Sequence, residues 1–314
     1  MRMIKLLYTS TLVIAFCFFS TASAQSFSFA AIGDVPYGPL SELTAVADTL
    51  NKNKLAFTIH VGDIKSGSSV CSDEIYLAVR EQFERFKQPL IYTPGDNEWT
   101  DCHRTSNGSY DPLERLEKIR GIFFATKNSL GKKPLALQVQ SDEARFMLFM
   151  ENRRWHQSKF SFATLHIVGS NNNLQPDLPS SIEFNLRNEA NIAWMRETFA
   201  QAQSRGDLGV VFAMQADTFY ADGKESDSTG FKSWLAAFQE EVQRWNKPVL
   251  LIQGDTHVLK VDHPVTNADG TRLDQVTRVV VQGGLQKNVV IVDVRADQPR
   301  DPFRIRQIPL SAGR

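Results

Sequence analysis

The feature that most constrains this chain is a repeated apolar run that leads to an aspartate, with an amphipathic stretch before the next run. Three such runs lie near the N-terminus, at 27–32, 55–61 and 89–93, and they lead to Asp34, Asp63 and Asp96. Between the runs, apolar residues recur three or four positions apart, which is the spacing of one helix face. This alternation predicts parallel strands covered by helices, an α/β fold.

Two later apolar runs also end at polar side chains. The run at 208–214 leads to Gln215, and the run at 248–253 leads to Asp255 and His257. In α/β sheets, ligands bind just beyond the carboxyl ends of the strands. We therefore expect these side chains and the three earlier aspartates to share one crevice. A group of carboxylates with an imidazole is typical of a metal site.

The remaining elements follow from caps and periodicity. Asp111 and Pro112 form a strong helix start, because Asp caps free amides and Pro fits the first turn. The stretch 170–181 is rich in Asn, Pro and Ser and is expected to be a loop. Further expected elements are strands at 145–151 and 160–168, paired antiparallel, strands at 276–281 and 289–294, and helices at 192–202, closed by Gly206, and at 231–245.

The first 24 residues have the pattern of an export signal. Arg2 and Lys5 make the start basic, residues 12–19 are apolar, and small residues follow. The apolar run is too short to span about 30 Å of hydrocarbon, which takes about 20 residues. We expect cleavage after Ala24, so that residues 25–314 form a single secreted or periplasmic domain that is not attached to a membrane.

The charge balance argues against a nucleic-acid partner. The chain has 35 basic and 35 acidic residues, and removal of Arg2 and Lys5 with the signal leaves a formal charge of −2. A nucleic-acid binder needs a basic surface to neutralise phosphates. We therefore expect no stable nucleic-acid partner, and no pattern in the sequence indicates an oligomeric state.

Two cysteines, Cys71 and Cys102, remain once the signal is removed. An even number of cysteines in an oxidising compartment favours one disulfide, and two buried free thiols are the alternative. Each cysteine follows a predicted site residue, Asp63 or Asp96, so a bridge would hold two site loops together. The spacing of the cysteines does not fit a C-x-x-C zinc pair.

Carboxylates at several strand ends suit the hydrolysis of a phosphate ester. This reaction needs neutralised phosphoryl oxygens and a nucleophilic water, and two divalent cations about 3.5–4 Å apart provide both. Such a pair needs a bridging carboxylate and further oxygen or imidazole ligands from different strands. A single Gly-Asp is a common turn. Three in order, followed by Gly254-Asp255-Thr256-His257, are a more specific signal.

At these motifs, over about residues 27–295, the chain resembles the calcineurin-like metallophosphoesterases, a family that includes the purple acid phosphatases. The resemblance implies an α/β sandwich of two mixed β-sheets flanked by helices, with two divalent metal ions at the strand ends. It implies that Asp34 and His257 bind the first metal and that Asp63 bridges both metals. It also implies that Asp96, in place of the family's Asn, binds the second metal. The implied substrate is a small phosphate ester.

Four further positions depart from the family's motifs. Pro36 replaces the His of the first motif, with Tyr37 beside it as a further candidate ligand, and Gln215 and Asp255 replace later His ligands. Asn97 replaces the His that protonates the leaving group. Gln215 and Asp255 keep a ligand oxygen, so the predicted site is rich in oxygen. Such ligands favour Mn, Mg or Ca over Fe or Zn.

The missing acid leaves two hypotheses for function. Asn97 can hydrogen-bond a phosphoryl oxygen, but it cannot donate a proton as a titrating acid. His103 is a candidate acid and Arg104 a candidate phosphate clamp if a disulfide at Cys102 holds their loop beside the crevice. An exposed loop without a role is the alternative. The leading hypothesis is an exported metal-dependent phosphoesterase, and the alternative is a non-catalytic metal-binding protein of the same fold.

Overall fold

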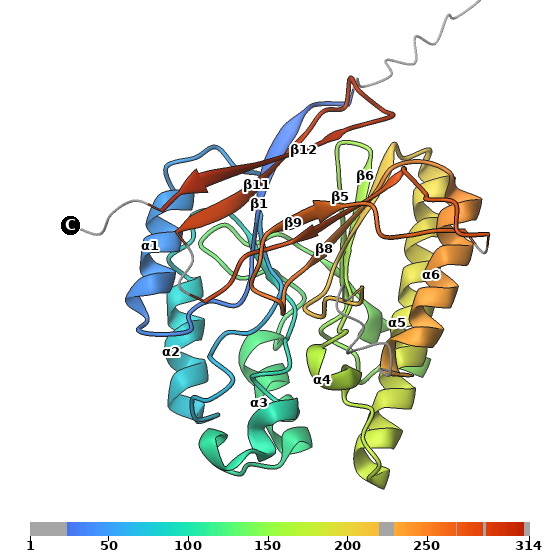
Figure 1. Ribbon diagram of the computed structural model, residues 1–314. Coiled ribbons are helices and arrows are strands. Elements are labelled where there is room, and N and C mark those ends of the chain that lie inside the picture. Colours follow the sequence, from blue (N-terminus) through green and yellow to red (C-terminus); the bar gives the residue numbers. More distant parts are fainter. Residues whose placement is uncertain (1–23, 220–228, 268, 285–286, 311–314) are drawn as a thin grey trace, which may run out of the picture.

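Two β-sheets pack face to face, and helices cover their outer faces (Figure 1). The computed structural model describes residues 24–219, 229–267, 269–284 and 287–310. The strands are β1 (Phe27–Ile32), β2 (Thr58–His60), β3 (Leu90–Tyr92), β4 (Gln138–Val139), β5 (Arg153–Gln157), β6 (Phe160–Thr164), β7 (Gly209–Ala213), β8 (Val249–Gln253), β9 (Lys260–Asp262), β10 (Val276–Val280), β11 (Asn288–Val294) and β12 (Phe303–Pro309). The helices are α1 (Ser41–Leu50), α2 (Asp73–Phe83), α3 (Pro112–Phe123), α4 (Gly169–Asn172), α5 (Leu178–Arg205) and α6 (Lys232–Trp245).

Both sheets are mixed. The first has the order β12-β11-β1-β2-β3, with β1, β2 and β3 parallel and β11 antiparallel to β1. The second has the order β4-β5-β6-β7-β8-β10-β9, with β6, β7, β8 and β10 parallel. The parallel strands of each sheet therefore end on the same side, as the sequence pattern predicts.

Alternation along β1 separates two hydrophobic cores. Phe29 and Ala31 lie in the core between the sheets, where Phe162 of β6 and Leu250 of β8 face them. Ala30 and Ile32 lie in a second core, formed with α1, α2 and α3. On the other side of the molecule, α5 and α6 cover β7 and β8 in a third core (Figure 1). Burial on both faces explains why the parallel strands read as continuous apolar runs.

Helix caps confirm several predicted boundaries. The Asp111 carboxylate accepts hydrogen bonds from the backbone amides of Leu113 and Glu114, at 2.8 and 3.0 Å, and Pro112 begins α3. At the end of α5, Gly206 has a left-handed backbone with φ of 67° and closes the helix. The helix predicted at 231–245 is α6, which begins one residue later.

Two predictions were wrong in detail. The strand expected at 145–151 does not form, because Phe146 and Phe149 instead pack against Ala190 of α5 in a short turn. The strand that pairs antiparallel with β6 is β5, further along the chain. The loop expected at 170–181 ends at Asp177, which caps α5 by accepting a hydrogen bond from Ser180 N at 2.9 Å.

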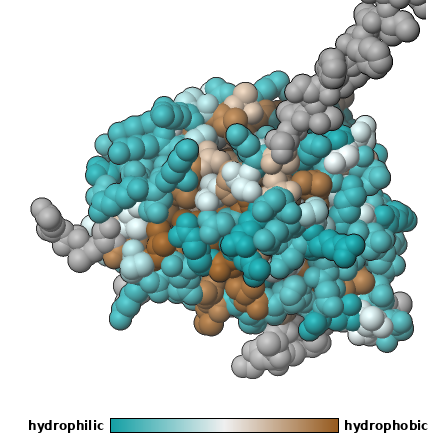
Figure 2. Space-filling view, turned by 90° about the horizontal axis from the view of Figure 1, so that it is seen from above, coloured by the Kyte–Doolittle hydropathy of each residue, from teal (hydrophilic) through white to brown (hydrophobic). Residues whose placement is uncertain are grey.

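The predicted signal at 1–24 falls almost wholly outside the described residues, since description begins at residue 24. In the described part of the chain, no helix is long and apolar enough to cross a membrane. Seen from above, mostly hydrophilic residues cover the molecule, with hydrophobic ones in small groups (Figure 2).

Candidate metal centre

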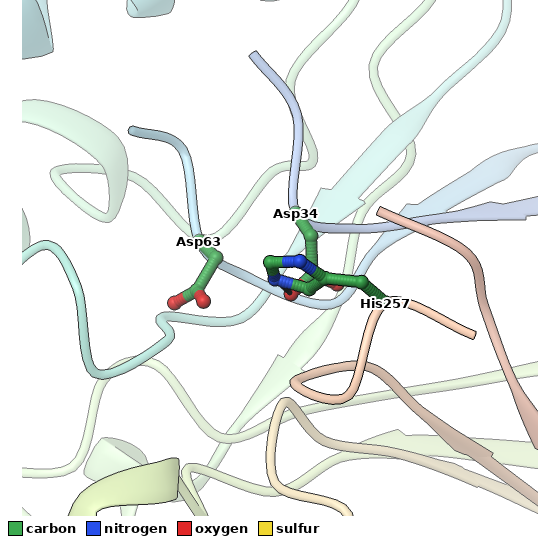
Figure 3. Close-up of side chains that lie close together, drawn as sticks. All are labelled: Asp34, Asp63 and His257. Atoms are coloured by element: carbon green, nitrogen blue, oxygen red, sulfur yellow. Dashed lines mark ion pairs between the residues drawn. The ribbon is translucent and has the colours of Figure 1, made fainter. Parts of the chain in front are cut away.

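The predicted site residues converge where the strands of both sheets end. Asp34 follows β1, Asp63 follows β2 and Asp96 follows β3 in the first sheet, and Gln215 follows β7 in the second. His257 comes shortly after β8 and returns over the first sheet. Ligand atoms of Asp34, Asp63 and His257 all lie within 4.8 Å of one another (Figure 3).

The backbone of this centre is unusual because the aspartates themselves adopt the left-handed region. The φ angles are 54° for Asp34, 57° for Asp63, 73° for Asp255 and 61° for His257. Such angles are uncommon outside glycine, and they cluster at functional sites where the surrounding structure holds them. At Asp34 and Asp255 the turn therefore bends at the aspartate, whereas at Gly62-Asp63 the glycine also adopts the left-handed region, with a φ of 100°.

The glycines of these pairs allow the backbone to pass close to the carboxylates of the site. A Cβ atom on Gly95 would lie 2.1 Å from Asp63 Oδ1, and one on Gly254 would lie 2.6 Å from Asp34 Oδ2. Any side chain at either position would displace a carboxylate of the site. Glycine is therefore required before these aspartates because the strand ends pack tightly around the carboxylates.

The first half of the centre consists of Asp34, His257 and Tyr37. Asp34 is fully buried, and its Oδ1 lies 3.2 Å from His257 Nε2 and accepts a hydrogen bond from Asp255 N at 3.1 Å. Its Oδ2 is buried and has no hydrogen-bond partner among the described residues. Burial raises the pKa of Asp34, and the hydrogen bond with Asp34 raises the pKa of His257.

Tyr37 contacts more residues of the centre than its position beside the first motif indicates. Its hydroxyl donates to Asp63 Oδ2 at 2.8 Å, accepts from Asn97 Nδ2 at 2.6 Å and lies 3.0 Å from His257 Nε2. The Tyr37 and His257 rings meet edge to face, with centroids 4.7 Å apart. Tyr37 therefore joins the residues after β1, β2, β3 and β8. The only sequence signal is its place three residues after Asp34.

Asp63 lies between the two halves. Its Oδ2 accepts a second hydrogen bond from Asn97 Nδ2 at 2.8 Å, and its Oδ1 accepts from Asn97 N at 3.2 Å. Burial, followed by the charges of Asp96 and Asp34, holds the pKa of Asp63 well above its usual range. Asn97 is therefore bound to the carboxylate that the sequence resemblance places between two metals.

The second half consists of Asp96, Gln215, Asp255 and Ser170. Both oxygens of Asp96 have partners: Gln215 Nε2 donates to Oδ1 at 3.0 Å, and Ser170 Oγ lies 2.8 Å from Oδ2. The Gln215 amide oxygen accepts from Gly169 N at 2.6 Å. A Cβ on Gly169 would lie 2.8 Å from Asp96 Oδ2 and 3.0 Å from Asp255 Oδ1, so both carboxylates face this glycine.

Glu98 orients the turn that carries Asp96 and Asn97. Its Oε1 accepts hydrogen bonds from Gly95 N at 2.6 Å, Asp63 N at 3.1 Å and the Tyr92 hydroxyl at 2.8 Å. Burial raises the pKa of Glu98 to about 7. Trp99 is fully buried beside it and packs the turn in place.

Lys65 is a residue of the centre that sequence reasoning missed. Its Nζ donates to Asn97 O at 2.7 Å and to Ser66 O at 2.9 Å, and burial lowers its pKa. It therefore places a cation against the turn that carries Asp96 and Asn97. Its position two residues after Asp63 is the only sequence signal for it.

The disulfide Cys71–Cys102 is present, with Cα atoms 5.8 Å apart. It holds the turn at 100–104 against the segment after Asp63, so the predicted link between the two site loops is confirmed. His103 and Arg104 lie on this turn, but they line a neighbouring pocket and do not contact the ligand group directly. The His103 Nδ1 atom lies 2.7 Å from Thr100 O, and Arg104 pairs with Asp101 at 2.6 Å.

The residues of the centre fit a cation. Asp34, Asp63 and Asp96 are each at most 6% exposed, and a buried charge is costly unless it is paired. In the described part of the chain, the Lys65 Nζ atom donates to two backbone carbonyls and makes no ion pair with these carboxylates. Asp34 Oδ2 has no hydrogen-bond partner among the described residues. A divalent cation would supply the missing charge, and carboxylates with one imidazole are suitable ligands.

Comparison with solved structures identifies the fold. A dimetal phosphatase from Danio rerio matches with a TM-score of 0.51 and 12% identity, over 91% of this chain and 99% of that one. GAP50, described as the anchor in the inner membrane complex of Plasmodium, matches with a TM-score of 0.50 and 10% identity, over 91% and 90%. A purple acid phosphatase from yellow lupin seeds matches with a TM-score of 0.51 and 11% identity; the match covers 91% of this chain and 54% of the phosphatase. No family model and no curated protein matches the sequence.

The chain therefore has the calcineurin-like metallophosphoesterase fold, in a form that has diverged strongly in sequence. The expected α/β sandwich of two mixed sheets flanked by helices is confirmed.

Proposed function

We propose that this protein is an exported metal-dependent phosphoesterase that hydrolyses a small phosphate ester at a binuclear, oxygen-rich centre. The observation that carries the proposal is the convergence of ligand atoms from Asp34, Asp63 and His257, all within 4.8 Å of one another, where the buried Oδ2 of Asp34 has no hydrogen-bond partner among the described residues. The match to a dimetal phosphatase over almost the whole of both chains supports it.

The proposed ligands follow the two halves of the centre. Asp34 and His257 would hold the first metal, Asp96, Gln215 and Asp255 would hold the second, and Asp63 would be shared by both. To bind a metal, Gln215 gives up the hydrogen bond that its amide oxygen accepts from Gly169 N. The metals are divalent, and the oxygen-rich ligands favour Mn, Mg or Ca over Fe or Zn.

The bound metals supply a nucleophilic water and neutralise charge on the phosphoryl oxygens. The chain's own residues orient the ester. Asn97 Nδ2 already donates to Asp63 and Tyr37, so it would exchange one of these hydrogen bonds for one to a phosphoryl oxygen, and Arg104, which pairs with Asp101, would take a second oxygen. Tyr37 holds Asp63, Asn97 and His257 in a fixed arrangement. His103 lies in the adjoining pocket, where it can give a proton to the leaving alcohol.

One observation favours a second candidate function, a non-catalytic metal-binding protein of the same fold. Asn97 stands at the position where the resemblance expects the leaving-group acid, and an amide does not titrate. GAP50, which matches this fold, is described as an anchor and not as an enzyme.

We further propose that residues 1–24 are removed on export and that residues 25–314 act as one secreted or periplasmic unit. The disulfide supports this location, since such bonds persist in oxidising compartments. The proposed partner is the phosphate ester itself, with neither a membrane nor a nucleic acid as a stable partner.

The test is hydrolysis of p-nitrophenyl phosphate by the full mature chain with Mn²⁺, Mg²⁺, Ca²⁺ or Zn²⁺, compared with Asp63→Ala. We expect Asp63→Ala to abolish turnover, because it removes the carboxylate shared by both metals. Asp301→Ala is the matched control, since the Asp301 side chain is 70% exposed. Full activity in a folded Asp63→Ala variant would reject the mechanism. A wild-type protein that binds metal but hydrolyses no ester would support the non-catalytic alternative.

A further inference from the structure

A pocket of about 710 Å³ adjoins the second half of the metal centre. It lies between the turn at 100–104 and the segment 170–180 that leads into α5. Its volume falls within the range of about 300–1,000 Å³ that is usual for small-molecule sites. The pocket is therefore large enough for a group considerably bigger than a phosphate.

The inner wall of this pocket is bonded directly to Asp96. Thr100 Oγ1 donates to Asp96 O at 3.0 Å, and the amide of Asp101 donates to the same carbonyl at 3.1 Å. Ser170 Oγ lies 2.8 Å from Asp96 Oδ2 and 2.9 Å from Asp101 Oδ1. The pocket therefore lies directly beside Asp96, a proposed ligand of the second metal.

Arg104 connects the pocket with Asn97. A Cβ atom on Gly67 would lie 3.8 Å from an Arg104 guanidinium nitrogen and 2.9 Å from Asn97 Oδ1, so both side chains lie against the same glycine. Arg104 also lines the pocket, where it pairs with Asp101. The pocket mouth is therefore continuous with the residues proposed to hold the phosphoryl group.

The charged residues that line the pocket leave it without an excess of positive charge. Arg104 is balanced by Asp101, and Asp177 adds a further carboxylate. A second phosphate on the substrate would meet these carboxylates, and like charges repel. The pocket is thus suited to an uncharged group.

The hydrogen-bonding groups of the pocket point to hydroxyls as their partners. Because Thr100 O can only accept, His103 Nδ1 carries the proton between them, and Nε2 is left to accept from a hydroxyl when the ring is neutral or to donate to one when the ring is protonated. Gln175 and Ser180 add groups that can both donate and accept. Among the described lining residues none is Phe, Tyr or Trp, so the pocket offers no aromatic ring on which a nucleobase could stack.

We propose that this pocket binds the alcohol portion of the substrate and that this alcohol is an uncharged polyhydroxylated group, a sugar or polyol. The inference rests on the proposed phosphoesterase function. In the reaction, water forms a new bond to phosphorus and the bond from phosphorus to the alcohol oxygen breaks. That oxygen keeps the electron pair and takes up a proton, so the products are inorganic phosphate and the free sugar or polyol.

The test compares kcat/KM for glucose 6-phosphate, AMP and p-nitrophenyl phosphate in the wild type and in a Gln175→Leu/Ser180→Ala double variant. Both changes remove polar groups from the pocket, and neither residue is a proposed metal ligand. Among the described residues, the one hydrogen bond to the centre that is lost runs from Gln175 Nε2 to Ser170 O, at 3.5 Å. The matched control is Gln203→Leu/Ser204→Ala at the far end of α5, where both side chains are exposed. We expect the pocket variant to lower kcat/KM for glucose 6-phosphate about tenfold, the loss of roughly two hydrogen bonds, and to change p-nitrophenyl phosphate less than twofold.

The outcomes separate the inference from the function on which it rests. A wild type that hydrolyses p-nitrophenyl phosphate but prefers AMP to glucose 6-phosphate would overturn the inference and leave the phosphoesterase function standing. An unchanged ratio between the two esters in the pocket variant would do the same. A wild type that hydrolyses none of the three esters with any of the four metals would reject both proposals together.

Discussion

The two halves of the centre differ in how far the protein itself satisfies their carboxylates. In the first half, Asp34 is fully buried and keeps one oxygen without a partner among the described residues. In the second half, both oxygens of Asp96 already have hydrogen-bond partners, Gln215 and Ser170. A buried, unpaired carboxylate oxygen is costly, so a cation gains more at the first half than at the second. The difference indicates that the two proposed metals bind with unequal affinity, the first more tightly.

The largest effect is expected from Asp34→Asn. Removal of this charge takes away the proposed first metal, and we expect phosphatase activity to fall by about 10²–10³-fold. The second metal should still bind, which elemental analysis of the purified variant would show. Asp48→Asn, at an exposed position on α1, is the control. Loss of both metals in this variant would mean that the two halves do not bind their metals independently.

The next largest effect concerns His60, which ties the turns of the first half together. The Gly62 amide donates to its Nδ1 at 3.1 Å, so Nε2 carries the proton and donates to Val35 O at 2.9 Å. The ring is fully buried against Phe83 and Tyr92, and burial lowers its pKa to about 4. The unfolded chain takes up a proton near pH 6.5, whereas the folded chain takes it up only near 4.

Stability contributed by neutral His60 is therefore complete above pH 6.5 and lost as the pH falls toward 4. The loss over this span is about 3 kcal/mol in the free energy of unfolding. Urea unfolding at pH 7 and pH 4 measures it, and His60→Gln should remove this part of the pH dependence. His263→Gln, on the second sheet, is the matched variant. Equal pH dependence in wild type and His60→Gln would show that the ring does not titrate in this way.

Gly169→Ala should disturb the second half selectively. The new methyl group would lie 2.8 Å from Asp96 Oδ2 and 3.0 Å from Asp255 Oδ1, closer than carbon and oxygen pack. We expect affinity for the second metal to fall about tenfold to a hundredfold, with the first metal retained. Gly121→Ala in α3 has nothing within 4 Å of its new methyl group and is the control. Metal titration of the two variants measures the effect, and equal loss at both metals would contradict it.

The smallest effect is expected from Tyr37→Phe, which keeps the ring and removes the hydroxyl. The variant loses the contacts to Asp63, Asn97 and His257, and we expect kcat to fall about tenfold. Metal content should stay unchanged if the hydroxyl only positions the other residues. A variant that loses a metal would instead make Tyr37 a ligand, which steady-state kinetics combined with elemental analysis would reveal.

Much of the fold could be predicted from the sequence because strand ends and helix faces leave local patterns. The apolar run at β1, the cap at Asp111 and the end of α5 at Gly206 all depend on neighbouring residues. The missed strand β5 shows the limit of this reasoning. Residues 145–151 look like a strand because they are apolar, yet Phe146 and Phe149 are buried by a helix some forty residues away.

The convergence of the proposed ligands was predictable to the extent that they come shortly after strands. Asp34, Asp63, Asp96 and Gln215 are in that position. The hydrogen bonds of Tyr37 and Lys65 could not be read from the sequence, because they depend on how the turns fold back over one another. Long-range packing also places Ser170 between Asp96 and Asp101, more than 60 residues away in the chain.

The central claim is that these strand ends form a metal centre with two unequal halves. Calorimetric titration of the chelator-treated protein with Mn²⁺ tests it most directly. The account predicts two ions per chain with distinct affinities, and loss of the tighter one in Asp34→Asn. Absence of saturable binding for Mn²⁺, Mg²⁺, Ca²⁺, Zn²⁺ and Fe²⁺, or unchanged binding of both ions in Asp34→Asn, would contradict it.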